Sequence, residues 1–206
     1  YYGESHPYVA SSLIRIGDIW NTKGDYDKAL EYYERGMAIN LQYYGESHPN
    51  VGWSKVRIGE IYQIKKQFEN AFEELSTSFE IMLTIYGQDS REAAKIKRRL
   101  GFLQVQMGSI EEGINLINAS LNMLIASGLE KDISLATTYM NLSTGYRVQK
   151  NYNEALDSIQ KAIEIFHENR GELHLDTAEA YVEYAQVFLA MNDAASAKKY
   201  FKKGNV

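Results

Sequence analysis

The chain has 206 residues, a formal net charge of −5 and no cysteine, and 45% of its residues are hydrophobic. These values are typical of an ordinary globular protein, and they exclude disulfides and thiol catalysis. No apolar run approaches the roughly 18 residues that a membrane-spanning helix needs, no signal peptide is visible, and the acidic balance opposes nucleic-acid binding. We therefore expect a cytoplasmic protein with no nucleic-acid partner and no membrane insertion.

The segment YYGESHP begins the chain at Tyr1 and recurs unaltered at Tyr43, which defines a 42-residue period. A fixed period of this length is typical of proteins built from stacked copies of one supersecondary unit. The period persists where identity has decayed, because the columns that start at Ile16, Tyr33 and Gly36 keep their size class in five copies. Two further columns hold only small residues: Gly17, Gly59, Gly101, Ser143 and Ala185, and Ala29, Ala71, Gly113, Ala155 and Ala197.

Each unit is predicted to contain two antiparallel helices, A and B, joined by a tight turn. Apolar and small residues spaced i, i+3, i+4, i+7 run along one helix face from Leu13 to Trp20, and the pattern resumes from Tyr26 to Met37. In the first unit we expect helix A over about residues 6–23 and helix B over about 26–43. The turn position holds residues suited to a left-handed helix end or to solvent: Gly24, Lys66, Gly108, Lys150 and Asn192.

The predicted fold class is all-α, a right-handed superhelical solenoid of about five antiparallel helix pairs. The pairs would form a single domain over 1–206, with repeats over about 6–47, 48–89, 90–131, 132–173 and 174–206. Terminal repeats of a solenoid need a polar outer face, and neither end is expected to supply one. We therefore expect a fragment of a longer array, or an array that packs end to end on another copy.

The ESHP segment forms the joint between units. The only prolines, Pro7 and Pro49, are expected at the first turn of a helix A, where the missing N–H costs nothing. His6, His48 and His174 share the preceding column, so successive repeats should space them along the array. We interpret them as residues that start helices and not as ligands of a metal.

The small column of helix A, the Ala29 column and the aromatic Tyr33 together resemble the tetratricopeptide repeat. The 42-residue unit with its G-x-x-H-P joint, YGESHPYVA at 2–10 and YGESHPNVG at 44–52, looks like the repeats of kinesin light chain. The resemblance covers the whole chain and implies a helical scaffold for protein interactions. Kinesin light chain usually carries an Asn-Asn pair in helix A, and only Asn141 survives here. Cargo recognition of the kinesin kind is therefore not carried over.

The resemblance also implies that helix A lines a concave groove. Arginine recurs at one groove position, at Arg15, Arg57 and Arg99, inside a molecule of negative net charge, and arginine forks suit carboxylates or phosphates. Five apolar residues are expected beside this stripe and open to solvent: Trp53, Val56, Phe102, Met140 and Val148. The candidate peptide-binding residues are Arg15, Trp53, Arg57, Lys95, Arg98, Arg99, Phe102, Asn141 and Arg147.

A second interpretation of the stripe remains open. Arg15 with Asp18, and Arg57 with Glu60, are spaced i, i+3 on one helix face, so each acid could satisfy its own arginine. The groove would then be a solvated wall without a ligand. The neighbouring pair at 98 and 99 does not fit this interpretation, because Phe102 stands where the acid would be.

No Gly-rich phosphate loop, metal-ligand spacing or nucleophile with an adjacent base is present, so we expect neither an enzyme nor a cofactor or metal site. His167, Glu168, His174 and Asp176 lie close in sequence, but they belong to a predicted surface joint between helices. The first functional hypothesis is a scaffold that binds an acidic and apolar peptide, or a partner helix, in its groove. The alternatives are a regulatory sensor or spacer in a larger signalling protein, for example one attached to a nucleotide-binding domain, and a self-associating solenoid.

Overall fold

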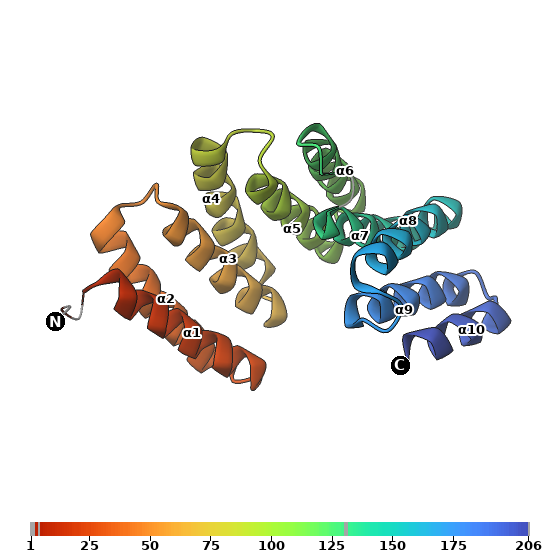
Figure 1. The fold of residues 1–206 in the computed structure, drawn as a ribbon, viewed down its shortest axis with the longest axis horizontal. Coiled ribbons are helices and arrows are strands. Elements are labelled where there is room, and N and C mark those ends of the chain that lie inside the picture. The colour runs from red at the N-terminus through yellow and green to blue at the C-terminus, as the bar shows by residue number, and fades with distance from the viewer. Residues whose placement is uncertain (1–2, 4, 130–131, 206) are drawn as a thin grey trace. The chain divides into compact units, whose positions relative to one another are not determined.

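The computed structural model describes residues 3, 5–129 and 132–205, and these residues form ten α-helices and no strand (Figure 1). The helices alternate between A and B of successive repeats, as the period predicts. In chain order they are α1 (Pro7–Thr22), α2 (Tyr26–Tyr44), α3 (Pro49–Ile64), α4 (Phe68–Tyr86), α5 (Arg91–Met107), α6 (Ile110–Ala126), α7 (Ile133–Val148), α8 (Tyr152–Arg170), α9 (Leu175–Ala190) and α10 (Ala194–Gly204).

The chain divides into two compact units, residues 1–88 and 89–206, and the division falls at the predicted boundary between the second and third repeats. The first unit contains the hairpins α1–α2 and α3–α4, and α2 packs on α3. Its core is built where the hairpins meet: Tyr33 of α2 packs with Ile58 and Ile61 of α3.

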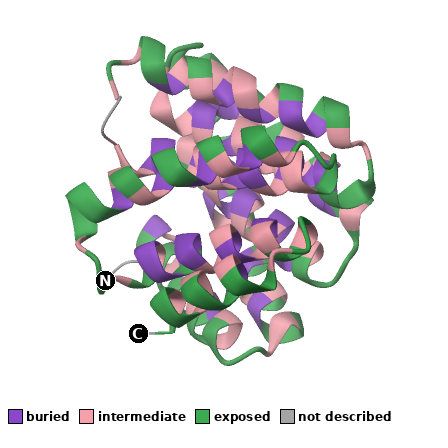
Figure 2. Ribbon diagram, turned by 90° about the vertical axis from the view of Figure 1, so that its right-hand side faces the viewer, coloured by how far each residue is buried: buried purple, intermediate pink, exposed green. Residues whose placement is uncertain are grey.

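The second unit contains the hairpins α5–α6, α7–α8 and α9–α10, in which each helix B packs on the helix A that follows it. One cluster joins Ile159 and Phe166 of α8 to Ala136 of α7 and Ala180 of α9. Buried and exposed residues alternate along the helices in Figure 2, as expected for helices that turn one face to a neighbour. None of the described helices is long and apolar enough to cross a membrane.

The turns between helices A and B confirm the predicted left-handed position. The first and third turns use Gly24 and Gly108, with φ of 79° and 92°. The other three turns place non-glycine residues in the same region: Lys66, Lys150 and Asn192, with φ of 59°, 67° and 63°. A left-handed residue closes helix A and lets the chain reverse within a few residues.

The two small-residue columns mark the closest approach of the helices within each hairpin. The approach is tightest between α5 and α6, where both positions are glycine. A Cβ built on Gly101 would lie 2.7 Å from the carbonyl oxygen of Gly113. A Cβ built on Gly113 would lie 2.6 Å from the carbonyl oxygen of Gly101. No side chain fits between these backbones, so the third repeat requires glycine at both positions.

The two terminal helices differ from the internal ones. Ile16 of α1 is 37% exposed, whereas its equivalents Ile58 and Leu142 are 1% and 2% exposed. Lys198 of α10 and Asn205, which directly follows α10, are exposed at positions that hold apolar residues in the other four repeats. These two positions are therefore polar in the fifth repeat.

Candidate peptide-binding site

Each A helix of the candidate site starts at a side-chain cap that occupies one column of the repeat. His6, His48 and His174 accept a hydrogen bond at Nδ1 from the backbone N–H two residues later, at 3.2, 3.1 and 3.1 Å. In the remaining repeats Ser90 caps α5 by accepting from the N–H of Ala93, and Asp132 caps α7 by accepting from the N–H of Ser134. This confirms the interpretation of the three histidines as residues that start helices, and it fixes the register of every A helix.

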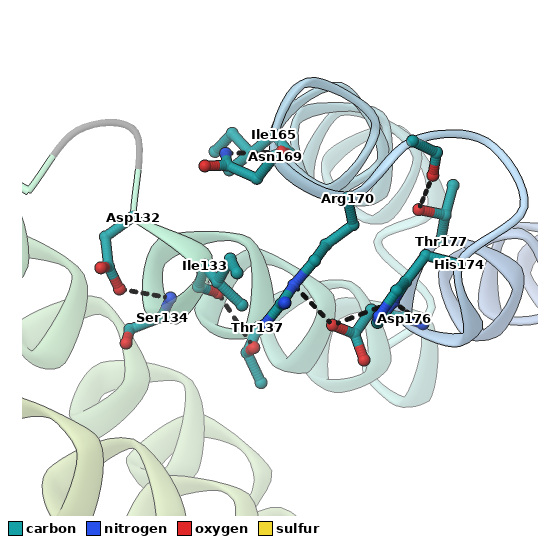
Figure 3. A network of polar contacts seen from close by, with 11 residues as sticks. Asp132, Ile133, Ser134, Thr137, Ile165, Asn169, Arg170, His174, Asp176 and Thr177 are labelled. Atoms are coloured by element: carbon teal, nitrogen blue, oxygen red, sulfur yellow. Dashed lines mark hydrogen bonds and ion pairs between the residues drawn. The ribbon is translucent and has the colours of Figure 1, made fainter.

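The joint before α9 shows how these residues are used (Figure 3). Asp176 lies between Arg170 and His174, 3.7 Å from Arg170 Nε and 3.4 Å from His174 Nδ1, and Thr177 donates to the carbonyl oxygen of Gly171. In the part of the chain that the structure describes, no group of three or more His, Asp or Glu side chains is arranged to hold a metal ion.

On the first unit, the candidate residues lie on α1 and α3. Arg15 is exposed, Trp53 is half-buried, and Arg57 donates from Nε to Asp18 Oδ1 at 3.1 Å. The same carboxylate oxygen accepts the Tyr33 hydroxyl at 2.8 Å. Burial and this hydrogen bond raise the pKa of Tyr33.

The pairing of Arg57 with Asp18 differs from the interpretation in which Asp18 satisfies Arg15 on its own helix. The bond runs from α3 back to α1, so it joins successive A helices. The two residues are separated by 39 positions in the sequence, about one helical turn less than the period. Arg57 is therefore already engaged by a carboxylate of its own unit.

On the second unit, α7 contacts both α5 and α9, so the three A helices lie next to one another. Arg147 of α7 holds Glu183 of α9 through two bonds, Nε to Oε1 at 2.9 Å and Nη2 to Oε2 at 3.3 Å. Asn141, one of the predicted residues, is only 8% exposed on α7. Arg147 thus joins neighbouring helices in the second unit, as Arg57 does in the first.

A further bridge, which sequence reasoning missed, joins α5 to α7. Arg91 places Nη2 2.8 Å from Asp132 Oδ2 and donates from Nε to Ser134 Oγ at 3.3 Å. Burial alone would raise the pKa of Asp132, but hydrogen bonds from Ser134 and the charges of Arg91 and Lys95 lower it overall. The sequence positions of these residues could have indicated the bridge, because Arg91 and Asp132 lie at the starts of helix A in consecutive repeats.

Lys95 and Arg98 follow Arg91 on α5 and differ from the other cations of the site. Lys95 is half-buried, and its pKa is lowered by burial and by the neighbouring charge of Arg91. Burial also lowers the pKa of Arg98, to about 10. The Nε of Arg98 is shielded from solvent and has no hydrogen-bond partner among the described residues. Of the remaining predicted residues, Arg99 and Phe102 are both half-buried on α5.

The apolar residues expected in the open wall divide into two groups. Val56 is 3% exposed, so it does not face solvent as expected, and Met140 is half-buried against the α7–α8 core. Their column turns toward helix B of the same hairpin. Trp53 and Phe102 are half-buried, while Val148 is 42% exposed.

The helical hairpins, their left-handed turns and their small-residue columns match a known family. The tetratricopeptide repeat model matches residues 8–63 and 134–204, more than half of the chain. The chain belongs to the tetratricopeptide repeat family. The all-α repeat fold expected from the 42-residue period is therefore confirmed.

Similar proteins agree with this assignment. The chain is 29% identical over 205 residues to Protein Kinesin Light Chain-Related 1 of Arabidopsis thaliana, covering 96% of this tetratricopeptide repeat chain and 32% of that protein. The crystal structure of BtubC (BKLC) from P. vanneervenii matches with a TM-score of 0.77 and 17% identity, over 96% of this chain and 79% of that one. The Rap conjugation gene regulator of plasmid pLS20, solved in complex with the Phr* peptide, matches with a TM-score of 0.79 and 16% identity, over 93% and 51%.

Proposed function

We propose that the chain is a protein-interaction scaffold, and that the face formed by α5, α7 and α9 binds a peptide or partner helix with acidic and apolar residues. Lys95 and Arg98 carry this proposal, because Lys95 is half-buried on α5 and the Nε of Arg98 is shielded from solvent with no hydrogen-bond partner among the described residues. Phe102 continues the same face of α5 and supplies half-buried aromatic surface. Aromatic and arginine side chains dominate the energetics of many peptide interfaces.

The internal ion pairs narrow the proposed ligand contacts to the cations of α5. Arg57 and Arg147 already hold Asp18 and Glu183, so an incoming carboxylate would have to displace a bonded acid at either position. On the first unit, Arg15 and Trp53 form a secondary candidate surface. The proposal is further supported by the Rap regulator, a protein of similar fold that was solved with a peptide bound.

The proposal is tested by fluorescence anisotropy with labelled 12-residue peptides that combine glutamate with leucine or phenylalanine. Peptides with glutamine in place of glutamate serve as matched ligands. We expect the glutamate peptides to bind and the double variant Arg98→Glu, Arg99→Glu to weaken binding at least tenfold, about 1.4 kcal/mol, with unchanged helicity by circular dichroism. Equal affinity of wild type and double variant would refute the proposal.

We also propose that the protein is cytoplasmic, that it has no catalytic activity and that it forms a single continuous domain. The chain spans about a third of the length of the curated relative it matches.

A further inference from the structure

Exposed lysines lie on one side of α10: Lys198, Lys199, Lys202 and Lys203. No ion pair joins these lysines to a carboxylate of a described residue. The Nζ of Lys199 lies 5.3 Å from the centre of the Tyr200 ring, and the Nζ of Lys203 lies 5.0 Å from that of the Tyr181 ring. These rings hold the two ammonium groups near the helix surface without neutralising their charge.

The fifth repeat reverses a charge that other repeats keep. The column of Lys199 is acidic in three of them, at Glu31, Glu73 and Asp157. In the first and fourth repeats this acid pairs with a base four residues later: Glu31 with Arg35 at 3.3 Å, and Asp157 with Lys161 at 2.7 Å. On α10 both positions hold lysine, so an attractive i, i+4 pair is replaced by a repulsive one, the α10 lysine pair (Lys199 and Lys203).

The exposure of the α10 lysine pair is a property of its two columns. The column of Lys199 is exposed in every repeat, and the column of Lys203 is exposed in every repeat except the third, where Ala119 is half-buried. In three of the other repeats helix B also packs on the helix A that follows it. The lysine pair therefore lies beside the surface that stacks one repeat on the next, and not on that surface.

The second repeat carries the opposite charge arrangement on α4. Glu69 and Glu73, the α4 glutamate pair, are exposed, lie four residues apart and have no ion pair with a described cation. Thr77 stands where the first and fourth repeats place the base, and its hydroxyl donates to the backbone carbonyl oxygen of Glu73 at 3.0 Å. The two carboxylates on α4 thus match the two ammonium groups on α10 in spacing and oppose them in sign.

We propose that the α10 lysine pair docks on the α4 glutamate pair of a second copy of this chain. Each helix carries a repulsion between like charges one turn apart, and the contact neutralises both repulsions at once. The interface is heterologous, because it joins different surfaces of the two copies. It uses B helices and leaves the proposed peptide-binding face of α5, α7 and α9 open, so the inference is independent of the proposed function.

Charge reversal tests the contact. The double variant Lys199→Glu, Lys203→Glu makes both surfaces acidic, and the double variant Glu69→Lys, Glu73→Lys makes both basic. Each variant alone should remain monomeric. An equimolar mixture of the two should associate, because each variant then offers the charge that the other one lacks. Association of the mixture also shows that neither substitution has unfolded its helix.

The measurement is sedimentation equilibrium of the full chain at ionic strengths of about 0.01 M and 1 M, where the Debye length is about 30 Å and 3 Å. We expect the mass of wild type to rise with concentration at low ionic strength, and high salt to lower the association constant at least about tenfold. Glu111→Lys, Glu112→Lys is the matched control, because it changes the net charge as the α4 variant does but replaces two exposed acids of α6. This control should associate like wild type.

Wild type that stays monomeric at low ionic strength would overturn the inference, as would a mixture of the two reversal variants that does not associate. Association that is lost in the α10 variant but kept in the α4 variant would exclude α4 as the docking site. Monomeric wild type that binds vesicles of phosphatidylserine and phosphatidylcholine through the lysine pair would assign this face to a membrane surface and overturn the second copy as its occupant.

Discussion

Asp18 accepts hydrogen bonds from two helices at one carboxylate oxygen, from the hydroxyl of Tyr33 at 2.8 Å and from Nε of Arg57 at 3.1 Å. The first bond closes the α1–α2 hairpin, and the second joins α1 to α3. A single acid thus links the packing inside one repeat to the packing between two repeats.

The two bonds of Asp18 should differ in strength. Tyr33 is buried, whereas Asp18 and Arg57 have side chains that are 46% and 36% exposed. In double-mutant cycles with Asp18→Ala, we expect a coupling energy of about 1–2 kcal/mol for Tyr33→Phe and under about 1 kcal/mol for Arg57→Met. Urea unfolding of the single and double variants measures both. A larger coupling to Arg57 than to Tyr33 would contradict the assignment.

Gly101 should be the least replaceable residue of its column. A Cβ at this position would meet backbone atoms of α6 at 2.7 Å, whereas a Cβ on Gly59 would first meet the Leu75 side chain, at 3.1 Å. We expect Gly101→Ala to lower the free energy of unfolding by about 1–3 kcal/mol and Gly59→Ala by less. Chemical denaturation of the two variants provides the comparison, and equal losses would show that the α5–α6 hairpin is no tighter than its neighbour.

The cap at His174 predicts a difference between two substitutions. His174→Ala removes the acceptor for the N–H of Asp176 and should cost about 1 kcal/mol, whereas His174→Asn keeps a capping side chain and should cost little. The measurement is thermal unfolding of wild type and both variants in the same buffer. If asparagine destabilised as much as alanine, capping would not be the role of this residue.

Asp132 predicts a pH dependence of stability. Its pKa is lowered from the value of 3.8 that it would have in an unfolded chain, so the ionised form stabilises the folded state. This contribution is present above pH 3.8 and is lost as the pH falls below it. We expect Asp132→Asn, which can still cap α7 but cannot pair with Arg91, to be less stable than wild type at pH 7. The deficit should shrink as the pH approaches 3, and a deficit independent of pH would argue against the ion pair.

The features that recur with the repeat were predictable from sequence, because each depends on one residue and its neighbours along the chain. Gly24 and Lys66 adopt the left-handed turn, His48 caps its helix, and Gly17 lies at a close helix approach. The period and the helical spacing of apolar residues therefore predicted the helices, their turns and the three helix starts at histidine.

The pairing of charged residues was not predictable in the same way. Arg57 bonds to Asp18 at a sequence separation of 39, and Arg147 bonds to Glu183 at a separation of 36, so neither pair follows the period. These separations depend on how neighbouring A helices cross. The orientation of the Val56 column was also misjudged, because a half-turn of the helix decides whether a position faces the groove or helix B.

The prediction of one continuous domain is still open to test. A single domain requires one unfolding transition by calorimetry, whereas independent units over 1–88 and 89–206 would give two.

The central claim is that the face formed by α5, α7 and α9 receives an acidic ligand. The most direct test is titration of the ¹⁵N-labelled chain with a glutamate-containing 12-residue peptide while backbone amide shifts are recorded. We expect the largest shifts to cluster on α5 and α7, around Lys95, Arg98 and Phe102. Shifts confined to the B helices α6 and α8, or no shifts at millimolar peptide, would contradict it.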